Sequence, residues 1–164
     1  QTPGCYGGYI IPNHTGLHCV GASCDIDDDS TELRSENEQQ VLTALTEELA
    51  EFETPEVASG RVAFRTSSQD HLPLIGPAPD LEFFRQNYAD LHHGKPAHRY
   101  PIAEYLPNLF LSVGHGSRGL VSAPFAAELI VNHLNHTTLV SNHSLTSSLH
   151  TGRFQIRKFK SNKS

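Results

Sequence analysis

The hydrophobic pattern is clearest between residues 109 and 134. Residues 109–113 (Leu-Phe-Leu-Ser-Val) are almost continuously apolar, which is typical of a buried strand. Three glycines then follow within six residues and predict a tight turn, since glycine reaches backbone conformations closed to other residues. Apolar residues at helical spacing predict a helix over 123–134. The sequence therefore predicts a strand, a glycine turn and a helix in direct succession.

The N-terminal part of the chain shows shorter patterns. Two apolar stretches, Tyr9–Pro12 and Leu17–Ala22, predict short strands joined by a hairpin-like loop. A helix is predicted over 36–52, because four apolar residues share one face. These residues are Val41, Leu42, Leu45 and Leu49.

Turn and capping signals bound this helix and predict a strand after it. Ser35 and Glu38 have the spacing of a capping box at the start of the helix. Pro55 is expected to end the helix, since proline cannot continue the hydrogen-bond ladder. The apolar and β-branched residues over 57–66 predict a strand.

The remaining segments give weaker patterns. Residues 77–107 are rich in proline and histidine and are expected to be irregular, apart from a short helix at 81–91. After Asn135, a run of Ser, Thr, Asn and His predicts a loop. A last strand is predicted over 153–158.

The predicted strand, glycine turn and helix together suggest an anion site. Backbone N–H groups without a partner and the positive end of the helix dipole meet at such a turn. Glycine also lets a ligand approach the backbone closely. An ordinary strand-to-helix turn has the same pattern, so the motif needs support from elsewhere in the chain.

That support comes from residues 61–77, where Arg65 stands on the predicted strand and a polar turn leads into Asp70-His-Leu-Pro-Leu-Ile-Gly76. Together with Gly116-Ser-Arg-Gly-Leu120 and Ser122-Ala-Pro124, this segment resembles the C-terminal part of the D-amino-acid-oxidase-like FAD amine oxidases. Within that family the motifs are similar to the oxidoreductase half of bifunctional bacterial enzymes that complete the methylaminomethyl group on the wobble uridine of tRNA. Supporting matches lie at 8–12, 20–22 and 153–158 and extend the resemblance over almost the whole chain.

The resemblance implies FAD as cofactor, with the glycine turn packed against the isoalloxazine ring. Dipoles fixed there would stabilise the negative charge that the N1 and C2 edge of the ring acquires on hydride uptake. The implied flavin contacts are Gly114, Gly116, Ser117, Arg118, Gly119 and Leu120.

The resemblance also implies three contacts to the carboxylate of an amino-acid-like substrate. They are Tyr9, Arg65 and Arg118. Guanidinium groups hold carboxylates in a bidentate manner, which fixes the orientation of the substrate. Asp70 is expected to cap the turn before His71 rather than to act as a base.

The implied reaction is the oxidative removal of the carboxymethyl group from 5-carboxymethylaminomethyl(-2-thio)uridine in tRNA, with release of glyoxylate. A methyltransferase domain that uses S-adenosylmethionine, outside this chain, would then methylate the amine. Two other hypotheses remain open. One is an FAD-dependent oxidase or dehydrogenase of a free amino acid such as glycine or sarcosine. The other is a non-enzymatic binding module that kept the sheet after losing the dinucleotide domain.

The predicted fold class is α+β, with a mainly antiparallel substrate-side sheet, covering helices and the flavin-contacting strand-turn-helix. No Gly-x-Gly-x-x-Gly lies near the start, so the Rossmann dinucleotide part is expected to be missing. The chain has no methionine and is interpreted as an excised piece of a longer protein, inactive alone. The predicted division is a substrate-side sheet and helix over 1–107, the flavin-facing part over 108–135, and a loop with a basic terminal strand over 136–164. The flavin-facing helix is expected to expose apolar surface.

Charge is distributed unevenly along the chain. The net charge is -6, which argues against a nucleic-acid-binding surface over the whole chain. Basic residues gather instead near the C-terminus, at Arg153, Arg157, Lys158, Lys160 and Lys163. They suggest a patch that contacts tRNA phosphates, although a solvated terminus would have the same composition.

Cysteine and metal-ligand patterns favour a metal-free protein of a reducing compartment. The three cysteines form no Cys-x-x-Cys pair, which fits the cytoplasm, and no apolar run approaches the roughly 20 residues of a membrane span. Acidic residues between Asp25 and Glu36 match calcium-loop positions, but Ser30 stands where the loop needs glycine. His92, His93 and His98 lie close together, yet their spacing fits no helical pair of metal ligands.

Overall fold

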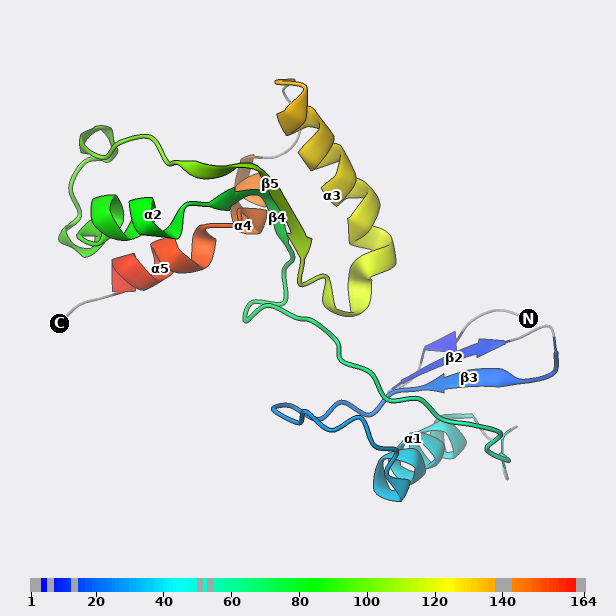
Figure 1. The fold of residues 1–164 in the computed structure, drawn as a ribbon. Helices are drawn as coiled ribbons and strands as arrows, with labels where there is room; N and C mark the ends of the chain where they lie inside the picture. The colour runs from blue at the N-terminus through cyan, green and yellow to red at the C-terminus, as the bar shows by residue number, and fades with distance from the viewer. Residues whose placement is uncertain are drawn as a thin grey trace. The chain divides into compact units, whose positions relative to one another are not determined.

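The computed structural model describes residues 4–5, 8–12, 15–49, 52, 55–137 and 143–161. The chain divides into two compact units, the N-terminal unit (residues 1–64) and the C-terminal unit (residues 65–164). Figure 1 shows the helices and strands of both units. Helices accompany two small antiparallel sheets, so the predicted α+β class is confirmed at this level.

The N-terminal unit contains a three-stranded antiparallel sheet. Its strands are β1 (Gly4–Cys5), β2 (Tyr9–Pro12) and β3 (His18–Gly21), in that order across the sheet. The two strands predicted here are confirmed, the second one residue shorter at each end. Residues 13–14 of the predicted connecting loop lie outside the described residues.

Helix α1 (Ser35–Glu48) contacts strand β3. The helix is confirmed, and Leu45 of its predicted apolar stripe is 1% exposed. The helix ends before the predicted position. Leu49 is its C-cap: the Leu49 N–H bonds to the Leu45 carbonyl, but the Leu49 backbone is no longer helical. Leu45 is therefore the most deeply buried residue of the stripe, while the other three are half-buried.

The predicted capping box at the start of α1 is wrong. The N-cap is Arg34, whose side chain makes no capping bond, and Ser35 is already helical. Arg34 pairs with Asp28, and Asp28 also accepts the Ser30 N–H at 2.9 Å. The carboxylate of Asp28 thus holds the chain that enters the helix, in place of a serine hydroxyl.

The strand predicted over 57–66 is also wrong. These residues are described but belong to no strand, and Val62 and Phe64 are 39% and 65% exposed. A β-strand needs a neighbour to share its ladder of hydrogen bonds, and none of the described strands pairs with this segment. Its β-prone composition alone does not make it a strand.

The C-terminal unit is built on a second antiparallel pair, β4 (Leu74–Pro79) and β5 (Tyr105–Val113). Strand β5 confirms and extends the strand predicted over 109–113. Strand β4 was not predicted, because two of its six residues are prolines, which lack the N–H of a central strand. A register shift between Pro77 and Pro79 accommodates them.

Helix α3 (Gly119–Leu134) packs against β4 and β5 (Figure 1). Ile75 of β4, Ala126 of α3 and Leu149 form the buried centre of this contact. The helix was predicted from residue 123 and begins four residues earlier, directly after the glycine turn. Partly buried residues surround the centre, namely Leu72, Phe125, Leu129 and Ile130.

A second, aromatic core lies around helix α2 (Leu81–Tyr88), which was predicted and is confirmed. Asp80 caps the helix by accepting the N–H groups of Glu82 and Phe83, each at 3.0 Å. Phe84 is completely buried, with its ring centroid 5.1 Å from that of Tyr88 and 6.3 Å from that of Tyr105. Short 3₁₀ turns η2 (Leu91–His93) and η3 (Ala97–Arg99) follow.

The predicted C-terminal loop and strand are wrong where the chain is described. Helix α4 (His143–Leu149) lies in the predicted loop, and the predicted strand over 153–158 belongs to helix α5 (Arg153–Ser161). Phe154 and Ile156 alternate like strand residues, but the residue that α5 buries most deeply is Arg153, at 4% exposed. Because the buried face of the helix carries an arginine, the apolar positions alone do not show the helical period.

Candidate functional site

The glycine turn connects β5 to α3 through a single 3₁₀ turn, η4 (Gly116–Arg118). Gly114 and Gly116 have φ angles of 73° and 58°, in the left-handed region that favours glycine. A Cβ atom on Gly116 would also lie 3.1 Å from the Ser67 hydroxyl oxygen. The turn therefore needs glycine for both its conformation and its close packing.

The glycine turn pairs directly with the segment that follows Arg65. The Gly116 N–H donates to the Thr66 carbonyl at 3.0 Å, and Ser67 forms an antiparallel bridge with His115. Two segments about fifty positions apart in the sequence are thus joined backbone to backbone. Thr66, whose carbonyl anchors the turn, directly follows Arg65, the predicted substrate arginine.

Both predicted arginines of the C-terminal unit are exposed to solvent. Among the residues that the structure describes, neither Arg65 nor Arg118 forms an ion pair with an acidic side chain. Arg118 is the N-cap of α3 and makes no side-chain capping bond. Their guanidinium groups are thus available to a ligand, and carboxylates and phosphates match the geometry of that group.

The surface beside the turn is open and apolar. Leu120 and Val121, in the first turn of α3, are 96% and 81% exposed. Further along the helix, Val131 and Leu134 are 51% and 56% exposed, as the sequence predicted for this helix. An exposed patch of this kind marks a surface that another group can cover.

His115 is a residue of the turn that the sequence analysis missed. Its Nδ1 lies 2.7 Å from the Ser122 hydroxyl, its Nε2 lies 3.1 Å from the Ser112 hydroxyl, and Ser122 donates its proton to the Arg118 carbonyl. Because that proton is already used, Nδ1 must carry a hydrogen and donate to Ser122. The imidazole therefore ties the end of β5 to the first turn of α3.

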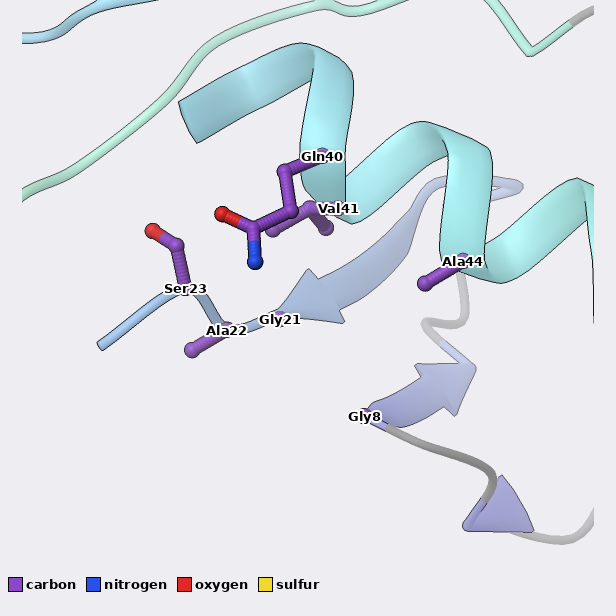
Figure 2. A pocket seen from close by; sticks show the side chains of 7 residues that line it. All are labelled: Gly8, Gly21, Ala22, Ser23, Gln40, Val41 and Ala44. Carbon is purple, nitrogen blue, oxygen red and sulfur yellow. The ribbon is translucent and has the colours of Figure 1, made fainter. Parts of the chain in front are cut away.

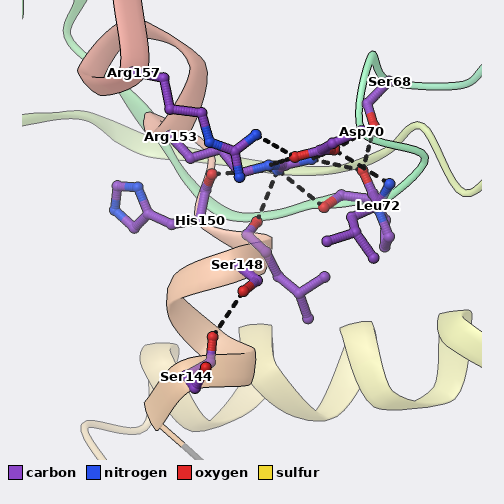
Figure 3. A network of polar contacts seen from close by, with 10 residues as sticks. Ser68, Asp70, Leu72, Ser144, Ser148, His150, Arg153 and Arg157 are labelled. Carbon is purple, nitrogen blue, oxygen red and sulfur yellow. Dashed lines mark hydrogen bonds and ion pairs between the residues drawn. The ribbon is translucent and has the colours of Figure 1, made fainter. Parts of the chain in front are cut away.

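Asp70 caps the turn at His71, as predicted, and also binds the last helix (Figure 3). It accepts the Ser68 hydroxyl at 2.9 Å and the Leu72 N–H at 3.3 Å. Arg153 binds the same carboxylate with two groups, Nε at 3.0 Å and Nη2 at 2.8 Å. The Arg153 guanidinium, with help from Arg157, holds the pKa of the Asp70 carboxyl far below its usual range.

The predicted basic patch is therefore corrected in part. Arg153 is buried and serves the interior of the unit, whereas Arg157 also pairs with Asp70 but has a side chain that is 53% exposed. Lys158 and Lys160 are exposed on α5, and Lys163 lies outside the described residues. Of the predicted phosphate contacts that the structure describes, Arg157, Lys158 and Lys160 therefore lie on the surface.

Tyr9 lies in the N-terminal unit, on β2 opposite Gly21 of β3. Its side chain crosses Gly21, since a Cβ on that glycine would be 2.7 Å from the tyrosine oxygen. The role of Tyr9 as a carboxylate contact stays a prediction.

The N-terminal unit has a small hollow between the end of β3 and α1 (Figure 2). Its volume of ≈ 70 Å³ is room for about two water molecules. The lining residues are Gly8, Gly21, Ala22, Ser23, Gln40, Val41 and Ala44. None of these described lining residues is charged, so the hollow is not a candidate for a substrate carboxylate.

Two findings concern the predictions about metal sites and membrane spans. Within the described ranges, no group of three His, Cys, Asp or Glu side chains is arranged to hold a metal ion. In the acidic segment, Asp25 accepts the Asn37 side-chain amide at 2.6 Å, while Asp28 pairs with Arg34. No described helix has both the length and the apolar character needed to cross a membrane.

His150 gives the C-terminal unit a predicted dependence on pH. Its Nδ1 accepts the Gly152 N–H at 3.1 Å, and its Nε2 lies 2.8 Å from the Tyr105 hydroxyl. Burial, and then the charge of Arg153, lowers the pKa of the His150 imidazole below its ordinary value. Because the unfolded chain takes up this proton first, the free energy of unfolding should fall as pH drops below about 6.5.

Urea unfolding at pH 7.5 and pH 5.5 checks this expectation. The fall should be smaller in a His150→Gln variant, which keeps a polar side chain but cannot be protonated. His98 is exposed, so a His98→Gln variant is the matched control and should follow the unmodified chain. An equal fall in all three proteins would contradict the prediction.

The turn has the properties that an FAD ring edge requires. Positive φ angles at two glycines let a flat ligand approach, and the N-terminus of α3 has no side-chain cap competing for its N–H groups. The spacing Gly114-x-Gly116-x-x-Gly119 equals that of a dinucleotide fingerprint, but β5 pairs antiparallel with β4 rather than within a parallel βαβ unit. The residues fit the flavin side of such a site better than its pyrophosphate side.

Comparison with known proteins defines the class. Residues 2–133 match the model of the FAD-dependent oxidoreductase family, and the chain belongs to this family. FAD is the cofactor that this membership supports.

Relatives with curated descriptions narrow the similarity. A protein of Pseudomonas syringae pv. tomato (strain ATCC BAA-871 / DC3000) is 37% identical over 96% of this chain and 25% of its own length. A second, from Pseudoalteromonas atlantica (strain T6c), is 34% identical over 94% of the chain and 22% of its own length. Both are described as tRNA 5-methylaminomethyl-2-thiouridine biosynthesis bifunctional protein MnmC. The chain spans about a quarter of the length of these relatives.

Proposed function

We propose that the full-length protein is a tRNA-modifying FAD oxidoreductase. Its substrate would be 5-carboxymethylaminomethyl(-2-thio)uridine at the wobble position, and its product 5-aminomethyl(-2-thio)uridine. One observation carries the proposal: Arg118 and the segment after Arg65 meet at a glycine turn whose backbone bonds to Thr66. The relatives described as MnmC support tRNA as the substrate.

The group to be removed is in effect an N-linked glycine, so its carboxylate is the natural handle. Arg65 and Arg118 are exposed and have no acidic partner among the described side chains, so either can take up a carboxylate. A bidentate pair with a guanidinium fixes both the position and the plane of the carboxylate. The carbon beside it is then presented in one orientation, and Tyr9 is proposed as the third contact.

The turn itself would hold the flavin. Gly114 and Gly116 allow close approach of the ring, and the helix α3 dipole favours negative charge at its N-terminus. FAD, when bound, supplies the acceptor for the hydride that leaves the carbon beside the carboxylate. The remaining flavin contacts are proposed to be Ser117, Arg118, Gly119 and Leu120.

Oxidation at a CH–NH bond accounts for the products without a dedicated acid or base on the protein. Loss of the hydride leaves a C=N bond, and water adds to that bond. Cleavage then gives the aminomethyl group on the uridine and free glyoxylate. A neutral amine needs no general base before it loses the hydride, which agrees with Asp70 being occupied by two arginines.

The parts of the protein outside this chain complete the proposal. A Rossmann dinucleotide part would bind the rest of FAD, and a methyltransferase domain using S-adenosylmethionine would act on the amine product. Within the chain we propose a substrate-side part over 1–107, a flavin-facing part over 108–135, and a C-terminal part over 136–164. The cytoplasm is the proposed compartment, since tRNA is the proposed substrate.

An Arg65→Ala variant of the full-length protein tests the function. Loss of the bidentate contact is expected to lower kcat/KM for the modified tRNA about 10- to 100-fold, since a hydrogen bond to a charged group contributes roughly 1.5–3 kcal/mol. Bound flavin is measured from the visible spectrum. Conversion is measured by digesting the tRNA and separating its nucleosides.

Arg61 supplies the matched control, because it is an exposed arginine four positions earlier in the sequence. An Arg61→Ala variant should retain the activity of the unmodified protein. Flavin-dependent oxidation of free glycine or sarcosine, with the tRNA left unchanged, would replace the proposal with a metabolic amine oxidase. Absence of bound flavin would indicate a binding module instead.

A further inference from the structure

We propose that Asp70 and Arg153 are positioning residues for the glycine turn and for Arg65. The last helix, α5, would hold the turn at 68–72. That turn would then keep the segment that carries Arg65 against the glycines. The role assigned to Arg65 rests on the proposed function. The mechanical link between α5 and the glycine turn does not.

Arg153 uses all of its donor groups on two parts of the unit (Figure 3). Besides the two bonds to Asp70, Nη2 donates to the Leu72 carbonyl at 2.6 Å and Nη1 to the Pro73 carbonyl at 3.1 Å. Nη1 also lies 3.4 Å from the His150 carbonyl, at the end of α4. One guanidinium, 4% exposed, therefore joins the carboxylate and two carbonyls of the turn to the start of α5.

The other side of the same turn faces the glycines. The Ser68 hydroxyl is hydrogen-bonded to Asp70, and the Ser68 amide nitrogen would lie 3.6 Å from a Cβ on Gly114. Ser67 bridges to His115, and Thr66 accepts the Gly116 N–H. The path from Arg153 to Gly116 thus passes through directly bonded or adjacent residues.

The residues before Arg65 belong to the other unit, and residues 57–64 form no strand. Arg65 is the first residue of the C-terminal unit, and the carbonyl of the next residue, Thr66, accepts the Gly116 N–H. Five positions after Arg65, Asp70 forms ion pairs with Arg153 and Arg157 of α5.

A lysine at position 153 separates this role from a general effect on folding. Lysine keeps the positive charge but presents a single ammonium group, which cannot bind a carboxylate and two carbonyls in one plane. An Arg153→Lys variant of the full-length protein should therefore fold, with an unchanged circular dichroism spectrum. Its Gly116 amide should exchange with deuterium at least about tenfold faster than in the unmodified protein.

Hydrogen exchange followed by mass spectrometry is the main measurement, because it reads the turn without any enzyme assay. Peptides covering 114–118 should lose protection, while those covering β4 and β5 keep theirs. In the activity assay, the variant should show about a tenfold higher KM for the modified tRNA with a smaller change in kcat. Arg85→Lys is the matched control, since Arg85 forms an exposed ion pair with Glu82 in α2.

Two results would overturn the proposal: unchanged exchange at 114–118, or an equal loss of protection over the whole C-terminal unit. If Arg153→Lys does not fold, Arg157→Gln removes only the outer arginine of Asp70 and should give a smaller loss confined to the same peptides. Faster exchange in a protein without tRNA activity would support the link while disproving the proposed function. The two ideas therefore fail separately.

Discussion

An Asp70→Asn variant is expected to lower the free energy of unfolding by about 3 kcal/mol or more. The substitution preserves the shape of the side chain and its acceptor oxygen for the Leu72 N–H. It removes the charge that balances Arg153, whose side chain is only 4% exposed. Leaving a buried guanidinium without its carboxylate costs far more stability than the intact ion pair contributes on balance. Urea unfolding of the 164-residue chain, followed by circular dichroism, measures the loss.

The exposed pair between Asp90 and Lys95 provides the matched control. An Asp90→Asn variant changes the same atoms at the surface, where water screens the charges, and should leave the unfolding midpoint almost unchanged. Equal effects at the two positions would show that the Asp70 pair is no stronger than a surface contact.

The ion pair between Asp70 and Arg153 should also make the stability of the unmodified chain depend on pH in the acid range. Because the Arg153 hydrogen bond lowers the pKa of Asp70, the stability that this carboxylate contributes is present above its unfolded pKa of about 3.8 and is lost as pH falls below it. The Asp70→Asn chain should lose less stability over that acid range.

A Phe84→Ala variant is expected to cost about 3–5 kcal/mol, the usual range for removing a fully buried aromatic ring. Phe84 is completely buried, and a Cβ on Gly152 would be 2.6 Å from its ring. That glycine lets the start of α5 pack directly on the ring, so the space left by alanine lies between α2 and α5. The unfolding midpoint in urea measures the cost.

Leu81, at the start of the same helix, is 49% exposed and serves as the control. A Leu81→Ala variant deletes apolar atoms that are already half in water and should cost less than about 1 kcal/mol. A Phe84→Ala cost as small as that of Leu81→Ala would mean that the aromatic core collapses around the missing ring.

Much of the fold could be predicted from local patterns. Strands β2, β3 and β5 and helices α1 and α2 follow from apolar spacing, and the turn after β5 follows from its glycines. These elements carry their signal within ten or so residues. Strand β4 escaped prediction because its prolines weaken that signal.

The errors come from partners that are distant in the sequence. Helix α5 reads as a strand because its most buried residue is a charged one, and that charge is balanced by Asp70, 83 positions earlier. The segment over 57–66 has strand composition, but none of the described strands pairs with it. In both cases the deciding contact is tertiary, and composition does not contain it.

For the candidate site, the sequence suggested the residues but not the contacts that hold them in place. The motifs around Arg65 and Arg118 lie in two segments that the Thr66–Gly116 hydrogen bond brings together, while the roles proposed for the two arginines stay predictions. His115 was missed because its partners, Ser112 and Ser122, stand three and seven positions away and form no recognisable motif with it. Arg153 was assigned to the surface because basic residues near a C-terminus usually lie there.

The separation of Asp70 from Arg153 also sets an order of assembly during translation. At about 5–20 residues per second, a ribosome adds Arg153 roughly 4–17 seconds after Asp70, given the 83 positions between them. In that interval the glycine turn and most of the elements around it have been synthesised, but the anchoring arginine has not. A nonsense codon between positions 123 and 152 would thus yield a product with every proposed flavin and carboxylate contact of this chain, and without the side chain that anchors the adjoining turn.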